Sequence, residues 1–357
     1  LEAMLPFLTE QFANPSGSHR AARAARRAVD EARDDIAEVM GVAPGDVVFT
    51  SGGTEADNTV IAGAPDGGAC CPTVEHPAVV EPVRARGGSL VGVDPTGHVD
   101  LDRLASVLGS ATAVVSVMAV NNEVGTVTDL ASVAALVRRA APGAVLHTDA
   151  VQAPMWLDLR SIAPHVDSMS LSAHKFGGPK GVGVMTVRRG TPFRPAIVGG
   201  GQEAERRSGT HNVAGIVAMA VALRRTDDER ASEVLRIASL RNRLVDRLTE
   251  RVAGVHETVP RSAKVAGAAH VCIDGVESES LLFCLDEADV CASAASSCAS
   301  GAMERSHVLA AMGVDPDRAR GALRLTLGRT STVDDVDRGV DAVAAAVERL
   351  RERAVAR

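Results

Sequence analysis

Short apolar runs alternate with helix-like stretches along the first part of the chain. The runs are rich in β-branched residues and end in polar turns, as Asp46–Thr50 and Ala144–Ala150 do. Between such runs, Arg20–Gly41 and Asp129–Ala141 have the composition of helices. Near-continuous apolar strands that alternate with helices predict a doubly wound, mostly parallel α/β sheet, which binds ligands at the carboxyl ends of its strands. The remaining strand candidates are Ala113–Val120, Ser168–Ala173 and Gly181–Val187.

The pattern changes near residue 230. Arg230–Val252 carries leucine, isoleucine and valine at helical spacing, which predicts a long linker helix. After it, His270–Gly275 and Val290–Ala295 predict strands of a smaller α+β domain, and an amphipathic helix closes the chain. We therefore predict a large domain over residues 1–231 and a small domain over residues 232–357.

Composition and charge narrow the function classes. The chain has 38 Lys and Arg against 45 Asp and Glu, a net charge of −7, and 46% hydrophobic residues. This balance is typical of a soluble globular protein. The chain has no apolar run of the about 18 residues that a transmembrane helix needs. It also has no basic stretch interleaved with aromatic residues, so we expect neither a membrane nor a nucleic acid among its partners.

The cysteines indicate the compartment. There are six of them, without a CxxC pair or a spacing typical of metal ligands. In a chain of this length, this usage predicts a reduced, cytoplasmic protein rather than a disulfide framework. Because the chain opens at Leu1 within a helix-like segment, we also expect further residues before it.

A lysine at the end of one predicted strand is the first candidate for chemistry. Lysine occurs only three times, at Lys175, Lys180 and Lys264. Lys175 follows Ser172 and His174 at the carboxyl end of an apolar run and enters a glycine-rich turn. A lysine in this place can form a Schiff base with a carbonyl cofactor such as pyridoxal phosphate. The alternative is an ordinary solvated lysine in a surface loop.

Two other strand ends supply further parts that pyridoxal phosphate needs. Asp149 ends one strand and can pair with the pyridine nitrogen, and Gln152 follows within reach of the phenolic oxygen. The strand-to-helix turn Ser51–Glu55 has two glycines and a threonine whose amides and hydroxyl can bind phosphate. By itself this turn is more often an ordinary helix cap. The three strand ends together favour a pyridoxal-phosphate site.

Eight segments in one order make the chain resemble a known family. They are NPSGSH, FTSGGTEADN, VEHPAVV, NNEVGTV, HTDAVQA, SLSAHKFGGPKGVG, GGGQEAERRSGT and RLTLGRTST, between Asn14 and Thr332. With these segments the chain resembles the cysteine desulfurases, in the class V branch of the fold-type I pyridoxal-phosphate enzymes. The resemblance implies the fold of that group, with a smaller α+β domain at the C-terminal end.

The resemblance implies roles in cofactor binding. Lys175 would hold the cofactor and move the Cα proton, Asp149 would pair with the pyridine nitrogen and Gln152 with the phenolic oxygen. His76 would stack on the ring, although a histidine before a proline can also cap a turn. Thr210 would reach the cofactor phosphate of the partner subunit in a homodimer. The implied phosphate ligands within the subunit are Gly53, Thr54, Ser172 and His174.

The resemblance also implies residues that bind the substrate, L-cysteine. Arg324 would hold the substrate carboxylate through a bidentate pair of hydrogen bonds. Arg324 lies on an apolar strand, where an inward charge is costly without a partner, and this favours a ligand-binding arginine over a solvated one. Asn14 would contact the substrate, and Asn122 would contact the cofactor or the substrate. Asn122 lies in a string that is also common in turns.

The resemblance points to Cys298 as the nucleophile. In the family a cysteine on a loop of the small domain attacks the substrate sulfur. Cys298 lies in a run of small residues, although this run has Ala-Ser-Ser where the family usually has Gly-Ser-Ala. The products would be L-alanine and a persulfide, which passes to a sulfur acceptor or scaffold protein for iron–sulfur cluster or thio-cofactor biosynthesis. Cys291 is predicted to be a buried strand residue, and four further cysteines look structural: Cys70, Cys71, Cys272 and Cys284.

Two alternatives stay open. A selenocysteine lyase or a small amino-acid aminotransferase of the same fold would keep Lys175 and Asp149 but would not need Cys298. A non-catalytic sulfur-relay or scaffold partner would not need Lys175, Asp149 or the phosphate-binding turn. The intact lysine, aspartate and phosphate turn favour an enzyme.

Overall fold

The structure, a computed structural model, describes residues 1–294 and 305–355, and its chain divides into two compact units. The first unit consists of Leu1–Val91, Leu101–Ala119 and Thr128–Arg230. The second unit consists of Gly92–Asp100, Val120–Val127 and Ala231–Arg357. Two short segments that the sequence assigned to the large domain therefore belong to the second unit.

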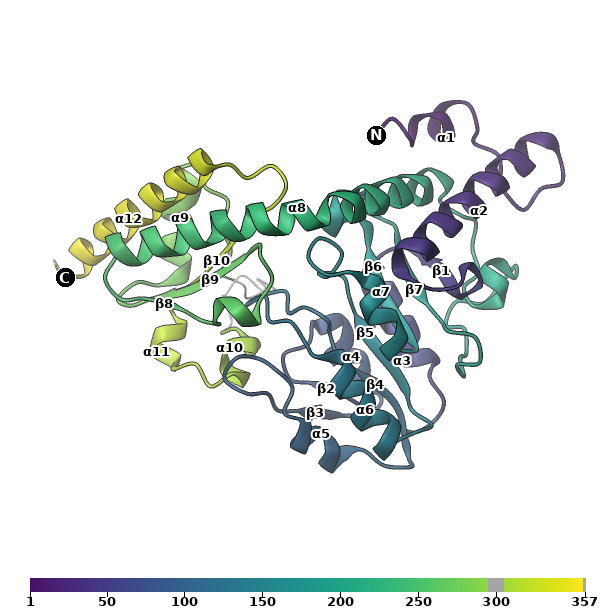
Figure 1. Ribbon diagram of the computed structural model, residues 1–357, viewed down its shortest axis with the longest axis horizontal. Helices are drawn as coiled ribbons and strands as arrows, with labels where there is room; N and C mark the ends of the chain where they lie inside the picture. Colours follow the sequence, from purple (N-terminus) through teal and green to yellow (C-terminus); the bar gives the residue numbers. More distant parts are fainter. Residues whose placement is uncertain (295–304, 356–357) are drawn as a thin grey trace. The chain divides into compact units, whose positions relative to one another are not determined.

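The first unit contains a seven-stranded sheet with the order β1-β7-β6-β5-β4-β2-β3, flanked by helices (Figure 1). Neighbouring strands from β6 through to β3 pair in parallel, whereas β7 runs antiparallel to both β1 and β6. This confirms the predicted mostly parallel α/β sheet. The strands are β1 (Val47–Thr50), β2 (Gly68–Pro72), β3 (Ser89–Val91), β4 (Thr112–Ser116), β5 (Val145–Asp149), β6 (Ser168–Ser172) and β7 (Gly183–Thr186).

The strand directions decide where a ligand can bind. Since β7 is antiparallel to β1 and to β6, β1 points the same way as β6, β5, β4 and β2. The carboxyl ends of these five strands therefore lie along one edge of the sheet. The turns and loops that follow them contain most of the predicted cofactor ligands.

Helices α2 and α6 agree with the two helices that the sequence predicts in this unit, Arg20–Gly41 and Asp129–Ala141. The chain leaves α2 at Gly41, whose φ of +71° is a left-handed conformation that suits glycine. Helices α3 and α4 pack their valines and isoleucine onto β2, β4 and β5 in one apolar cluster. The helices are α1 (Leu5–Thr9), α2 (Arg20–Met40), α3 (Gly53–Gly63), α4 (Pro77–Ala85), α5 (Leu101–Val107), α6 (Leu130–Ala140) and α7 (Leu159–Ile162).

Helix α8 (Val213–Arg251) begins in the first unit and ends in the second. The predicted linker helix is its C-terminal part. The second unit has a three-stranded antiparallel sheet with the order β10-β9-β8. Its elements are β8 (Val255–Glu257), β9 (Ala268–Ile273), β10 (Ala322–Thr326), α9 (Ser278–Glu287), α10 (His307–Ala311), α11 (Pro316–Ala319) and α12 (Val333–Val355).

The strand predicted over Val290–Ala295 is wrong as far as the structure describes that segment. Residues 291–294 form one isolated bridge, between Ser293 and Arg324, instead of a strand. The side chains of this segment are small, so they offer little surface to pack along a neighbouring strand. Cys291 is also exposed rather than buried.

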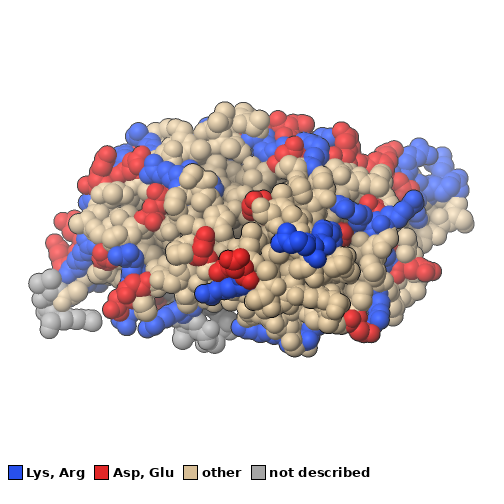
Figure 2. Space-filling model, turned by 60° about the horizontal axis from the view of Figure 1, so that its bottom comes forward, with Lys and Arg blue, Asp and Glu red and all other residues tan. Residues whose placement is uncertain are grey.

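The surface mixes both signs of charge. Basic and acidic residues are interspersed over the face shown in Figure 2. Among the helices of residues 1–294 and 305–355, none is long and apolar enough to cross a bilayer.

The α3–α4 cluster generates a stability prediction. Ile61 of α3 is fully buried among Val79, Val83 and Val114. Substitution Ile61→Ala is expected to lower the free energy of unfolding by about 2–5 kcal/mol, because it leaves a cavity in a close-packed core. Urea unfolding followed by circular dichroism measures this loss. The control is Leu235→Ala, at a side chain that is 75% exposed, and it is expected to change the free energy of unfolding by less than about 0.5 kcal/mol. An equal loss in both variants would contradict the assignment of Ile61 to a close-packed core.

Candidate active site

Three chain segments meet at the carboxyl edge of the first sheet. A Cβ atom on Gly53, the first residue of α3, would lie 2.7 Å from Val151 Cγ2 and 3.6 Å from Ser172 Cβ. A Cβ atom on Gly183 would lie 2.7 Å from the Cα atom of Gly52. The turn after β1, the segment after β5 and the end of β6 are therefore in contact, and glycine is required where they approach each other.

The β1–α3 turn can hold an anion. Helix α3 starts at Gly53, and no side chain caps its N-terminus, so its first amides point to the edge of the sheet with the positive end of the helix dipole. Thr54 is exposed beside them, and Ser172 Oγ lies 2.9 Å from His174 Nδ1. Burial and the nearby charge of Lys175 lower the pKa of His174. The structure thus brings together all four predicted phosphate ligands.

Asp149 ends β5 as a buried carboxyl group. One of its oxygens accepts a hydrogen bond of 2.9 Å from the backbone N–H of Val151. Burial raises the pKa of Asp149 to about 6, although the Val151 bond and the charge of Lys175 act in the opposite direction. A ligand cation at this edge would stabilise the ionised form. Gln152 is half-buried in the turn that follows.

Lys175 and His76 follow two other strands of the sheet. Lys175 is exposed in the 3₁₀ turn Ala173–Phe176, directly after β6. His76 follows β2 as the N-cap of α4, where its Nδ1 atom accepts a 3.1 Å hydrogen bond from the N–H of Ala78. His76 therefore does cap a helix, and it is an exposed residue at this edge of the sheet.

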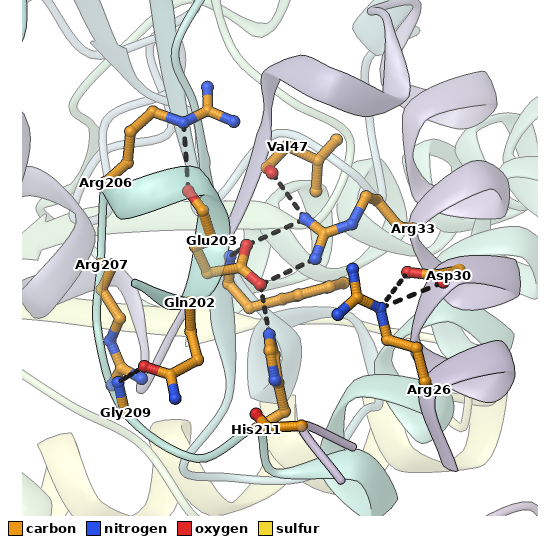
Figure 3. A network of polar contacts seen from close by, with 12 residues as sticks. Arg26, Asp30, Arg33, Val47, Gln202, Glu203, Arg206, Arg207, Gly209 and His211 are labelled. Carbon is orange, nitrogen blue, oxygen red and sulfur yellow. Dashed lines mark hydrogen bonds and ion pairs between the residues drawn. The ribbon is translucent and has the colours of Figure 1, made fainter. Parts of the chain in front are cut away.

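Glu203 is a hub that the sequence did not predict (Figure 3). Its side chain is 2% exposed, and Arg33 of α2 donates to both of its oxygens at 2.7 and 2.9 Å. The N–H of Phe49 donates to Oε2 at 2.9 Å, and His211 Nε2 lies 2.6 Å from Oε1. The hub therefore ties α2 and β1 to the segment that carries Thr210.

That segment adopts an unusual backbone conformation. Glu203, Ala204 and Glu205 have φ values of 53°, 53° and 65°, in the left-handed region that non-glycine residues rarely adopt. The bonds of the Glu203 carboxylate offset this strain. Thr210 is exposed and lines, with Ser51 of the β1–α3 turn, a cavity of about 180 Å³ in the same unit.

Asn122 and Arg324 both belong to the second unit. The guanidinium of Arg324 donates a 2.8 Å hydrogen bond to the backbone oxygen of Asn122. Burial lowers the pKa of Arg324, and the nearby Glu123 carboxyl opposes that shift. Ser293 pairs with Arg324 through two backbone bonds, and Ser306 Oγ donates to Glu123 Oε2 at 2.5 Å. Ser293, before residues 295–304, is thus bonded to Arg324, and Ser306, after them, is bonded to Glu123, whose charge acts on Arg324.

The remaining predicted residues are placed as follows. Cys298 lies outside the described residues. Asn14 is exposed, and its side-chain oxygen accepts a 2.9 Å bond from the N–H of Ser16. The four cysteines predicted to be structural are confirmed as buried: Cys70, Cys71, Cys272 and Cys284. Within residues 1–294 and 305–355, no group of three or more His, Cys, Asp or Glu could hold a metal ion.

Comparison with known proteins identifies the family. A family model described as aminotransferase class-V matches residues 1–338. A cysteine desulfurase of Gluconacetobacter diazotrophicus is 38% identical over 99% of this chain and 90% of its own length. A cysteine desulfurase of Bradyrhizobium diazoefficiens is 40% identical over 98% of this chain and 91% of its own length.

Solved structures are similar as well. A structure described as a NifS-like protein aligns with a TM-score of 0.90 at 33% identity, covering 97% of this chain and 94% of its own. A NifS-like protein from Rickettsia africae aligns with a TM-score of 0.87 at 26% identity, covering 97% and 95%. The similarity therefore includes both units of the chain.

The Glu203 hub generates a pH-dependent prediction. Although burial raises the pKa of Glu203, the bonds from Arg33 and His211 overcome this and hold it at about 2. A lowered carboxyl pKa stabilises the fold above the pKa of the unfolded chain, and this stability is lost as the pH falls. Glu203→Gln is expected to lower the free energy of unfolding by about 3 kcal/mol above about pH 5, with a smaller loss at about pH 3.

Urea unfolding at several pH values measures this difference. Glu81→Gln is the matched control, because Glu81 forms an exposed ion pair with Arg84, worth at most about 1 kcal/mol. A Glu203→Gln loss of the same size at every pH would contradict a stabilising charge on Glu203.

Proposed function

The chain belongs to the aminotransferase class-V family, and we propose that it acts as a cysteine desulfurase, which takes sulfur from L-cysteine and releases L-alanine. Its curated relatives carry that name. The observation that supports it most is the buried Asp149 carboxyl at the edge of the first sheet where Val151, two residues later, approaches the uncapped N-terminus of α3. Lys175 follows the next strand of the same sheet.

The residues at this edge fit pyridoxal phosphate. The carboxylate of Asp149 is destabilised by burial, and a protonated pyridine nitrogen would supply the positive charge that it needs. At Gly53 a Cβ atom would take up space between Val151 and Ser172, so the turn leaves its amides accessible to a phosphate. When bound, the cofactor supplies an electron sink for the pair left at the substrate Cα after its proton departs.

In this proposal each residue of the edge has one task. Lys175 holds the cofactor through its aldehyde and carries the proton at the substrate Cα. Gln152 donates a hydrogen bond to the phenolic oxygen, and His76 stacks on the ring from its N-cap position. Gly53, Thr54, Ser172 and His174 bind the phosphate.

The second unit supplies the groups for the substrate. Arg324 binds the carboxylate of L-cysteine by a bidentate pair of hydrogen bonds, which the planar guanidinium favours. Burial of Arg324 strengthens this pairing, because less water competes for the charge. Asn122, whose backbone oxygen accepts a bond from Arg324, contacts the cofactor or the same substrate. Asn14, a residue of the first unit, also contacts the substrate.

Cys298 takes the sulfur atom. Its thiolate attacks the substrate sulfur, an S–S bond forms, the bond between sulfur and Cβ breaks, and L-alanine leaves after protonation. The persulfide on Cys298 passes to a sulfur acceptor or scaffold protein for iron–sulfur cluster or thio-cofactor biosynthesis. Ser293, five residues before Cys298 in the sequence, is bonded to the backbone of Arg324, the residue that we propose for the substrate carboxylate, and this supports the task of Cys298.

We further propose a homodimer in which Thr210 contacts the cofactor phosphate of the partner subunit. The Glu203 hub supports this role, because it holds the segment of Thr210 in one conformation. The cytoplasm is the compartment that we predict for this reaction.

The nucleophile is tested by mass spectrometry of the intact protein after addition of L-cysteine without reductant, with peptide mapping around Cys298. We expect one persulfide on Cys298, released L-alanine, and loss of both in Cys298→Ser, because the serine hydroxyl cannot accept the sulfur atom. Cys291→Ser is the matched control, since Cys291 is exposed seven residues earlier in the chain.

The control is expected to form the persulfide as the unsubstituted protein does. Bound cofactor without a persulfide on Cys298 would contradict the assignment and favour a lyase or aminotransferase. A persulfide that persists in Cys298→Ser but disappears in Cys291→Ser would move the nucleophile to Cys291.

A further inference from the structure

A row of buried polar side chains crosses one face of the first sheet beside Asp149. His147 lies two residues before Asp149 on β5 and therefore on the same face. Ser170 of β6 is the register partner of Asp149, and Ser116 of β4 is that of His147. His147 Nδ1 lies 2.8 Å from Ser116 Oγ, and Nε2 lies 2.9 Å from Ser170 Oγ. The four side chains thus form a continuous polar row.

Helix α3 adds a second carboxyl group to this row. Asp57 is 1% exposed, and its Oδ1 atom lies 3.6 Å from His147 Nε2. The Ser170 hydroxyl acts on the same carboxyl group and lowers its pKa, against the larger effect of burial. A third buried carboxyl, Glu75, accepts a 2.5 Å bond from the N–H of Met118. Three acids are therefore enclosed in a small volume of the protein interior, where an ionised carboxylate is costly.

Burial is the largest influence on the protonation of all three acids. Burial lowers the pKa of His147 to about 3, so its ring is neutral near pH 7. Lys175 acts on Asp149, but the influences on Asp57 and Glu75 come from burial, other carboxyls and hydrogen bonds. Burial and the charge of Asp149 raise the pKa of Asp57 and of Glu75 well above the usual range. Asp149 is therefore the first of the three to ionise.

We propose that Asp57 is a positioning residue that stays a neutral acid next to Asp149, so that Asp149 carries the charge that faces the pyridine nitrogen. This inference rests on the proposed role of Asp149 in the desulfurase. It explains why α3 places a carboxyl group, rather than an apolar side chain, over β5 and β6.

A neutral Asp57 also gives the row one direction of hydrogen bonding. A protonated carboxyl has one O–H donor, which Asp57 uses toward Ser170. The hydroxyl of Ser170 then donates to His147 Nε2, and the N–H on Nδ1 donates to Ser116 Oγ. This fixes one tautomer of His147 and holds the side chains of Ser116, His147 and Ser170 in one arrangement next to Asp149.

Infrared spectroscopy of the full-length chain at neutral pH tests the protonation state without relying on activity. We expect a C=O stretching band of protonated carboxyl groups in the unsubstituted protein and the loss of one such component in Asp57→Asn. Asp30→Asn is the matched control, because Asp30 is exposed and paired with Arg26, and it is expected to leave the band unchanged. An unchanged band in Asp57→Asn would overturn the proposal, since Asp57 would then be ionised.

Cofactor affinity supplies the second readout. Asparagine resembles the neutral acid in shape and charge, so Asp57→Asn is expected to change the Kd for pyridoxal phosphate by less than about tenfold. A larger loss of affinity would show that the site uses a negative charge on Asp57, which contradicts the proposal. If Asp57→Asn does not fold, Ser170→Ala replaces it: a neutral Asp57 loses its hydrogen-bond acceptor and its C=O band shifts, whereas an ionised one gives no band to shift.

The two proposals fail in different ways. An unsubstituted protein that does not bind pyridoxal phosphate would contradict the desulfurase function, while the infrared band would still report on Asp57. A protein that binds the cofactor but shows no band from Asp57 would contradict only the inference about Asp57.

Discussion

Burial of the Asp149 carboxyl at the carboxyl edge of the first sheet is the constraint on which the rest of the site depends. A charge in this place is unfavourable without a cation, so the site is complementary to a protonated ring nitrogen. Lys175 follows the neighbouring strand, and the N-terminus of α3 contacts the segment after Asp149. A single buried charge, a nearby lysine and an anion site are what a phosphorylated pyridine aldehyde requires.

The two units contribute different parts of the proposed chemistry. The first unit, with its parallel strands, supplies the groups for cofactor binding and proton transfer. The second unit supplies Arg324 with Asn122 beside it, and it anchors Ser293 and Ser306 on the two sides of the segment with Cys298.

The sequence predicted the sheet and the residues at its edge because both depend on local signals. Asp149 and Lys175 each end an apolar run, and parallel strands bring such ends together. The Glu203 hub had no local signal: its partner Arg33 is 170 residues away, and its backbone is left-handed without a glycine. Cys291 was predicted to be buried from its apolar neighbours, but the small residues after it form one bridge and leave it exposed.

Reduction with borohydride attaches the cofactor permanently to the lysine that holds it, and so identifies that lysine. The chain has three lysines, Lys175, Lys180 and Lys264, so peptide mapping after saturation with pyridoxal phosphate distinguishes them. We expect the cofactor mass on Lys175 and on neither of the other two lysines. Attachment at Lys180 or Lys264, or no attachment at saturating cofactor, would contradict a site built around Asp149 and Lys175.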